Sequence, residues 1–138
     1  MKLMSRRAAG LAGTVVLLAG TGATPAYAAD GRAGTKVSDP NGACADNSVG
    51  NTHVQVCYLD YGDKLYVKDK EADGRSAYGY ITWPDKEPCR NSYGAGTWVM
   101  CNYDIPEDMR ILYKGYTQDN EGYFNPWHDE TAETSEWS

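Results

Sequence analysis

The fold of this chain is decided by residues 53–69, which read HVQVCYLDYGDKLYVKD. Before the acidic turn YGD, Val54, Val56 and Tyr58 occupy every second position, and after it Leu65 and Val67 do the same. Successive side chains of a strand point to opposite faces, so this period of two predicts two β-strands, each with one buried face.

The same period of two continues through the rest of the central region. It recurs at 76–83, 97–103 and 109–113, and the runs are separated by turn-forming pieces such as Asp73-Gly74 and Pro84-Asp85. No stretch sustains a helical repeat. Residues 43–127 are therefore predicted to form a small, all-β, antiparallel β-sandwich with short connections.

The first 28 residues have the composition of an export signal. Lys2, Arg6 and Arg7 precede an apolar stretch around residues 11–19, and a small-residue cleavage site ends at Ala28. This pattern predicts a signal peptide over 1–28, because the glycine-broken apolar stretch is too short to span a membrane. The mature protein is then expected to be secreted and extracellular.

Charge excludes two classes of partner. The full chain of 138 residues has 13 basic and 19 acidic side chains, a net charge of -6. Three of the basic residues lie in the predicted signal, so the mature chain carries 10 basic and 19 acidic groups, a net charge of -9. So acidic a chain lacks the basic stripe that nucleic acids and anionic membranes require.

The two ends of the mature chain show no apolar periodicity. Residues 29–42 are rich in glycine, aspartate, serine and threonine, and are expected to form a flexible lead-in. Residues 128–138 contain four acidic side chains and are expected to form a disordered acidic tail.

An internal repeat emerges when the chain is shifted against itself by 44 positions. Residues 47–85 and 91–129 then share eight identities in 39 positions. The identical pairs are Asn47 and Asn91, Ser48 and Ser92, Gly50 and Gly94, Cys57 and Cys101, Asp60 and Asp104, Lys70 and Lys114, Trp83 and Trp127, and Asp85 and Asp129. One interpretation is two pseudo-repeat units, each a three-stranded sheet, with Trp83 and Trp127 as large anchors in or near the core.

The four cysteines are expected to staple this small core. Four cysteines allow three pairings, and their spacing alone does not choose between them. A duplication favours one bridge inside each unit, which pairs Cys44 with Cys57 and Cys89 with Cys101. Each closure would stabilise the fold by about 3 kcal/mol in the chain-entropy description.

Candidate catalytic and metal-binding residues are few. With the cysteines paired, a nucleophile would need His53 or His128 as its base, but a lone strand histidine is more often a partly buried polar residue. The acidic loop at Asp69, Glu71 and Asp73 imitates the start of a calcium loop, but an EF-hand needs a glutamate where Tyr80 stands. A calcium site of another kind remains an alternative to an ordinary turn there, and no cofactor is expected.

Tyrosine dominates the aromatic residues, with eleven Tyr and four Trp against one Phe. Tyr66, Tyr78 and Tyr80 lie on strand faces opposite to the expected core positions, so they are candidates for an exposed binding cluster. Rigid aromatic rings with a polar edge suit a sugar face or a protein contact. The alternative is that these rings only stiffen the strand faces or fill the small core.

Four segments, 61–69 (YGDKLYVKD), 72–83 (ADGRSAYGYITW), 94–98 (GAGTW) and 101–103 (CNY), carry a resemblance. They resemble a group of small secreted proteins common in Streptomyces and related actinobacteria, over roughly residues 44–116. The resemblance implies a secreted, disulfide-containing β domain and brings no activity or catalytic residues with it.

These observations lead to three functional hypotheses. The first is a monomeric, non-enzymatic binding or interaction module for an extracellular protein or glycan. The second is a secreted inhibitor or toxin-like protein that acts on an extracellular enzyme through the loop 91–97. The third is a small glycan hydrolase that uses acidic loop residues as paired carboxylates.

Overall fold

The computed structural model describes residues 31–119, 127–128 and 130–138 of the chain, so the predicted signal at 1–28 lies outside the described residues. These residues form eleven strands and one short 3-10 helix. The elements are β1 (Arg32–Ala33), β2 (Thr35–Val37), η1 (Asn41–Cys44), β3 (Ser48–Gly50), β4 (Val54–Leu59), β5 (Lys64–Asp69), β6 (Ser76–Trp83), β7 (Cys89–Asn91), β8 (Trp98–Asn102), β9 (Arg110–Gln118), β10 (Trp127–His128) and β11 (Thr134–Trp137).

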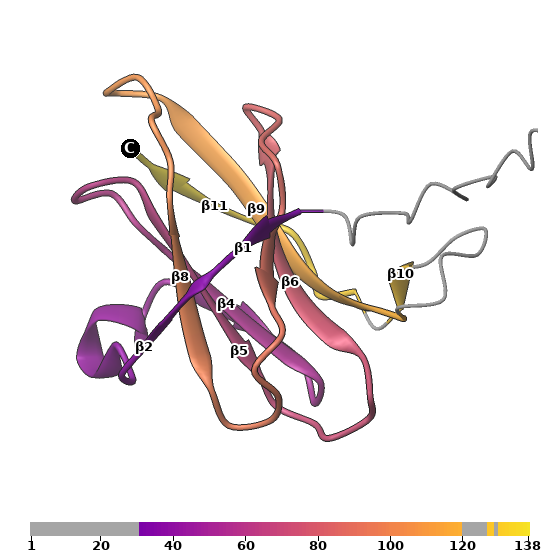
Figure 1. The fold of residues 1–138 in the computed structure, drawn as a ribbon. Helices are drawn as coiled ribbons and strands as arrows, with labels where there is room; N and C mark the ends of the chain where they lie inside the picture. The colour runs from indigo at the N-terminus through magenta and orange to yellow at the C-terminus, as the bar shows by residue number, and fades with distance from the viewer. Residues whose placement is uncertain (1–30, 120–126, 129) are drawn as a thin grey trace, which may run out of the picture.

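The strands form two sheets that pack face to face, which confirms the predicted β-sandwich (Figure 1). Sheet A has the order β1-β7-β6-β9-β10, with β11 also paired to β9, and sheet B has the order β2-β8-β5-β4-β3. All neighbours are antiparallel except β1 and β7, which run parallel. Among the residues that the structure describes, no helix has the length and apolar character needed to cross a membrane.

The alternating runs in the sequence became the central strands. β6 has the predicted bounds, β8 is one residue shorter than the predicted 97–103 at each end, and β9 continues to Gln118, beyond the predicted 109–113. Leu65, Val67, Ala77 and Ile81 are fully buried, as expected. Trp83 is the exception, because it is 60% exposed and so does not anchor the core.

Two glycines set the closest approach of the two sheets. Gly79 of β6 and Gly115 of β9 are cross-strand partners in the middle of sheet A. A Cβ at Gly79 would lie 2.6 Å from Cγ2 of Val67, and one at Gly115 would lie 2.6 Å from Cγ2 of Val56. The valines of sheet B therefore occupy the space that side chains at these two positions would need.

A buried asparagine adds a polar link between the sheets. Asn91 of β7 is fully buried, and its amide nitrogen donates to the carbonyl oxygens of Val67 at 3.0 Å and Thr97 at 2.7 Å. Its side-chain oxygen accepts from the backbone N–H of Tyr93 at 3.1 Å. The amide is thus satisfied on both ends, as a buried polar group must be.

Both predicted disulfides are present, Cys44 with Cys57 and Cys89 with Cys101. The first ties η1 to β4. The second joins β7 of sheet A to β8 of sheet B, so it is a covalent link between the layers. The duplication therefore predicted the pairing correctly.

The duplication did not predict the sheet topology. β4, β5 and β8 lie in one sheet and β6, β7 and β9 in the other, so each sheet mixes strands of both halves of the chain. The expected pair of three-stranded sheets, one per unit, is replaced by sheets of six and five strands. The side chain of Trp127 lies outside the described residues.

The expected flexible lead-in over 29–42 is wrong for its central part. β1 pairs with β7 in sheet A, and β2 pairs with β8 in sheet B, so this segment crosses from one layer to the other (Figure 1). Gly34 makes the crossing possible, because a Cβ there would lie 2.5 Å from Cγ2 of Val99. The segment is ordered by hydrogen bonds to β7 and β8, and its own sequence shows no pattern that predicts this pairing.

The expected disordered tail over 128–138 is also wrong for most of its length. β11 pairs with β9 from Thr134 opposite Tyr113 to Trp137 opposite Arg110. Beyond it, the backbone N–H of Ser138 donates to the carbonyl oxygen of Met109 at 2.9 Å. The tail is ordered by main-chain pairing to an edge of β9, which does not depend on apolar side chains.

Candidate functional site

The three candidate tyrosines do not form one exposed cluster. Tyr66 lies in β5 of sheet B, whereas Tyr78 and Tyr80 lie in β6 of sheet A. Their neighbours in sequence face the core, so all three rings lie on outer faces of the sandwich. Tyr78 is only 1% exposed, so the expectation of an open three-tyrosine patch is wrong.

Tyr78 stacks on a cross-strand partner, and the N-terminal segment also lies against it, since a Cβ at Gly31 would stand 3.3 Å from its Cε1. Its ring lies parallel to that of Tyr116 of β9, with centroids 5.0 Å apart and an angle of 3° between the planes. Tyr116 is also 1% exposed. Sequence alternation placed the ring on the outer face correctly, but it does not reveal what covers an outward side chain.

Next to this stacked pair is a pocket of about 500 Å³, which we call the tyrosine pocket. It is lined by Gly31, Tyr80, Asp85, Lys86, Glu87, Pro88 and Tyr116. The floor comes from β6 and β9, and one wall comes from the loop between β6 and β7. Of the three candidate tyrosines, the structure places only Tyr80 in this pocket.

The wall of the tyrosine pocket is held in place by hydrogen bonds. The backbone N–H of Lys86 donates to the carbonyl of Ile81 at 3.1 Å, and that of Arg32 donates to the carbonyl of Pro88 at 2.7 Å. The hydroxyl of Tyr103 donates to the carbonyl of Glu87 at 2.6 Å. A pocket wall fixed in this way loses little conformational entropy when a ligand binds.

Charge in the tyrosine pocket is set mainly by carboxylates. The hydroxyl of Tyr80 donates a hydrogen bond to Oδ1 of Asp85. That bond, with smaller effects from burial and from the charge of Asp85, raises the pKa of Tyr80. Tyr80 therefore stays neutral at physiological pH and presents a partly exposed ring beside the carboxylates of Asp85 and Glu87.

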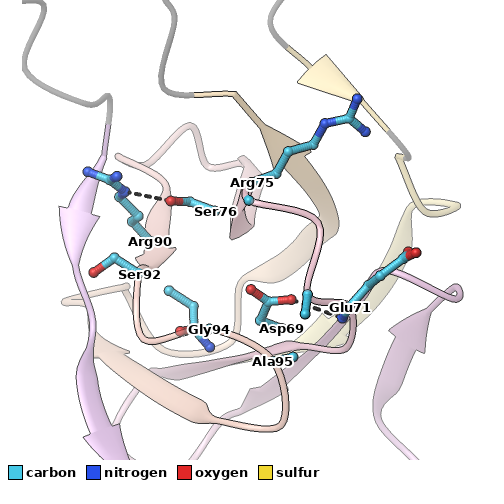
Figure 2. Close-up of a pocket in the computed structure, with 11 residues that line it drawn as sticks. Asp69, Glu71, Arg75, Ser76, Arg90, Ser92, Gly94 and Ala95 are labelled. Carbon is cyan, nitrogen blue, oxygen red and sulfur yellow. Dashed lines mark hydrogen bonds between the residues drawn. The ribbon is translucent and has the colours of Figure 1, made fainter.

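A second pocket, of about 370 Å³, lies between the β5–β6 and β7–β8 loops, and we call it the aspartate pocket (Figure 2). Asp69, at the end of β5, is 3% exposed, and Figure 2 shows its carboxyl group directed into the space between the loops. Burial raises the pKa of Asp69, while the hydrogen bond from the backbone N–H of Glu71 opposes that rise.

The charged groups around the aspartate pocket already have partners. Arg90 donates through Nε to the hydroxyl of Ser76 at 3.2 Å, and Arg75 pairs through Nε with Asp119 at 2.8 Å. Glu71 is the other acidic residue of the lining, and its side chain points away from the pocket in Figure 2. Asp69 and Glu71 thus do not face each other as glycosidase carboxylates do across a substrate.

The calcium candidates are divided in the structure. Asp69 faces the aspartate pocket, whereas Glu71 and Asp73 lie beside the imidazole of His53, with one ligand atom from each within 4.8 Å of the others. From the sequence, His53 is expected to be a partly buried polar residue or a catalytic base, and nothing there groups it with the two carboxylates. The signal that could have found this grouping is the pairing of β4 with β5, which sets the start of one strand opposite the end of the other.

The loop 91–97 is exposed and well anchored. Gly94 and Gly96 have φ values of 95° and 82°, which favour glycine, and Tyr93 between the strands is 56% exposed. The backbone N–H of Gly96 donates to the carbonyl of Asp69 at 2.8 Å. The loop therefore presents Tyr93 from a rigid base inside the Cys89–Cys101 closure.

Comparison with protein-family models, curated proteins and solved structures gives no significant match for this chain.

Proposed function

We propose that this protein is an exported, non-enzymatic binding module that holds a glycan in the tyrosine pocket. The observation that carries the proposal is the combination of the partly exposed ring of Tyr80 with the carboxylates of Asp85 and Glu87 around one pocket of about 500 Å³. Sugar rings offer an apolar face and a rim of hydroxyl groups, which match an aromatic ring and carboxylate acceptors respectively.

The charge of the site narrows the class of glycan. Asp85 and Glu87 are exposed carboxylates, Lys86 is the single basic residue of the lining, Nε of Arg32 lies 3.8 Å from Oε2 of Glu87, and the chain as a whole has a net charge of -6. An anionic polysaccharide would be repelled by this balance. The ligand is therefore a neutral glycan, whose hydroxyl groups donate to the carboxylates.

Export is part of the same proposal. The residues 1–28 have the pattern of a secretory signal, and two disulfides are compatible with an oxidising compartment outside the cytosol. A glycan ligand would be met in that environment, as a soluble polysaccharide or as part of a cell surface.

The test is calorimetric titration of the oxidised protein with soluble neutral polysaccharides, namely a β-glucan, a mannan and a galactan. Tyr80→Ala should weaken binding about 5- to 30-fold, which corresponds to the loss of one or two kcal/mol of contact. Tyr66→Ala is the matched control, because it removes an outward tyrosine from the opposite sheet, and it should leave the affinity unchanged.

Two results would count against the glycan pocket. One is the absence of binding to every neutral polysaccharide tested. The other is a Tyr80→Ala variant that binds as tightly as the wild type while Tyr66→Ala loses affinity. Capture of a protein ligand by the tyrosine pocket, with no glycan bound, would replace the proposal with a protein-recognition role.

The loop 91–97 supports a second candidate function, inhibition of an extracellular enzyme. Its rigidity and the exposed ring of Tyr93 are the features of a loop that can enter an active site without large entropy loss. Titration against secreted proteases tests it. Inhibition that disappears in Tyr93→Ser and persists in Tyr80→Ala would favour this role over glycan binding.

A further inference from the structure

A group of three metal-ligating side chains lies apart from the tyrosine pocket, where β4 begins and β5 ends. Val54 is paired with Asp69, and the backbone N–H of Lys70 donates to the carbonyl of His53 at 2.9 Å. This pairing carries His53 next to the loop that follows β5. Further along that loop, Glu71 and Asp73 turn their carboxylates toward the imidazole.

The three donor atoms are close enough to share one ion. Nδ1 of His53 contacts Oε2 of Glu71 and lies 3.9 Å from Oδ2 of Asp73, and the ligand atoms of all three residues lie within 4.8 Å of one another. Donors around a tetrahedral zinc ion, each at about 2.1 Å, are about 3.4 Å apart. Binding an ion thus requires the donors of His53 and Glu71 to move apart and the most distant donors to approach, each by about 1–1.5 Å.

Both loops hold these donors in position. The side-chain oxygen of Asn51 accepts the backbone N–H groups of His53 at 2.8 Å and Val54 at 3.0 Å. In Asp73, Oδ1 accepts the backbone N–H of Arg75 at 2.9 Å, which leaves Oδ2 directed toward the imidazole. The site is therefore organised by the fold before any ion binds.

The surroundings of these three side chains favour a cation and leave one side of the site open to solvent. Glu71 and Asp73 place two carboxylates beside the imidazole, and Asp69 ends β5 two residues before Glu71, so the region is rich in carboxylates. Nδ1 of His53 is shielded from solvent, whereas the side chain of Glu71 is 48% exposed. Water or another ligand can complete the coordination from that exposed side.

The donor set identifies the kind of ion. Calcium takes six to eight oxygen ligands, whereas one imidazole nitrogen with two carboxylate oxygens suits zinc and its first-row neighbours. We infer that His53, Glu71 and Asp73 form a binding site for a divalent transition-metal ion, with zinc the best fit. The inference does not depend on the glycan proposal, because the two sites share no residue.

The test uses untagged, oxidised protein dialysed against zinc, with bound metal measured per chain. We expect one zinc ion per chain, and His53→Gln and Asp73→Asn should each lower the affinity at least about tenfold. Asp46→Asn is the matched control. Asp46 is exposed and precedes β3, whose Ser48 lies opposite Cys57, away from His53. This variant should bind zinc as the wild type does.

A second measurement on the wild type keeps the test independent of any folding defect in a variant. Zinc at about a hundredfold excess over its Kd should raise the folding equilibrium constant about a hundredfold, and it should shift the imidazole proton resonances of His53. Calcium at the same concentration as zinc should not displace the zinc. Absence of stoichiometric zinc, unchanged affinity in His53→Gln, or displacement by equal calcium would each overturn the inference.

Discussion

Replacing Gly79 with alanine should push the two sheets apart. The new Cβ would stand 2.6 Å from Cγ2 of Val67 and 3.0 Å from both Cδ2 of Leu65 and Cγ1 of Val56. Carbon atoms in good contact are about 3.5–4.0 Å apart, so one contact is too close by about 1 Å and two by at least about 0.5 Å. All three neighbours are fully buried and have no open space to move into.

The expected cost follows from these overlaps. Overpacking a well-packed core by one methyl group costs about 1–3 kcal/mol, and the lower entropy of the unfolded alanine chain returns about 0.4–1 kcal/mol. We therefore expect Gly79→Ala to lower the free energy of unfolding by about 1–2 kcal/mol. For a domain of this size, that corresponds to a fall in Tm of about 4–16 °C.

Urea unfolding under oxidising conditions measures this loss. Gly42→Ala is the control, since nothing lies within 4 Å of its Cβ position, and it should be close to neutral. Val67→Ala removes the closest clashing atom, so the double variant Gly79→Ala with Val67→Ala should be more stable than the sum of the single losses by about 1 kcal/mol. A neutral Gly79→Ala, or strictly additive losses, would refute the close-packed glycine contact.

Three further predictions concern buried polar and covalent links. Asn91→Ala should cost about 2–4 kcal/mol in urea unfolding, because two buried carbonyl oxygens lose their donor, and a loss below about 1 kcal/mol would show that water replaces the amide. Removing the inter-sheet bridge with Cys89→Ala and Cys101→Ala should cost about 3 kcal/mol, and a change of less than about 1 kcal/mol would contradict this. Asp69→Asn should alter the pH dependence of stability. Because burial raises the pKa of Asp69 in the folded state, the wild type loses stability as pH rises from about 3.9, the unfolded pKa, through the folded pKa. The variant should gain stability relative to the wild type as pH rises above about 3.9, and a difference that stays constant with pH would refute the raised pKa.

The central strands could be predicted because their pattern has a direct physical cause. A strand with one buried face must alternate, and 64–69 do so in burial without interruption. Residues 76–83 alternate only in part, because Ser76 and Tyr78 are also buried and Trp83 is exposed after a register shift. The disulfides could be predicted for a different reason, since the duplication gives each unit its own cysteine pair. Neither argument required knowledge of distant contacts.

The edge strands could not be predicted, because their pairing is not encoded in local alternation. Residues 32–37 and 134–137 contain few buried side chains, and they are ordered by main-chain hydrogen bonds to β7, β8 and β9. Such bonds need only an open edge, whatever the side chains are. The same limit explains the topology, since similar strands of the two halves were distributed over both sheets.

The candidate site was predicted in part. Tyr80 stands in the tyrosine pocket, but Tyr116 lies 28 positions after Pro88, the last loop residue of the lining. Only the pairing of β6 with β9 brings Tyr116 to this site. Tyr78 points outward as alternation predicts, yet it is 1% exposed, with Tyr116 stacked on it and Gly31 close to its ring. The abundance of tyrosine indicated an aromatic site. The position of that site depends on the register between β6 and β9, which composition does not contain.

Mapping the glycan site by chemical-shift changes in the protein tests the central claim most directly. The experiment titrates ¹⁵N-labelled protein with an oligosaccharide of the polysaccharide that binds best and follows every backbone amide. The account predicts that the largest shifts fall on Tyr80, Tyr116 and the loop 85–87, with those around Tyr66 unchanged. Shifts centred on Tyr66 or on the loop 91–97 would contradict a glycan site in the tyrosine pocket.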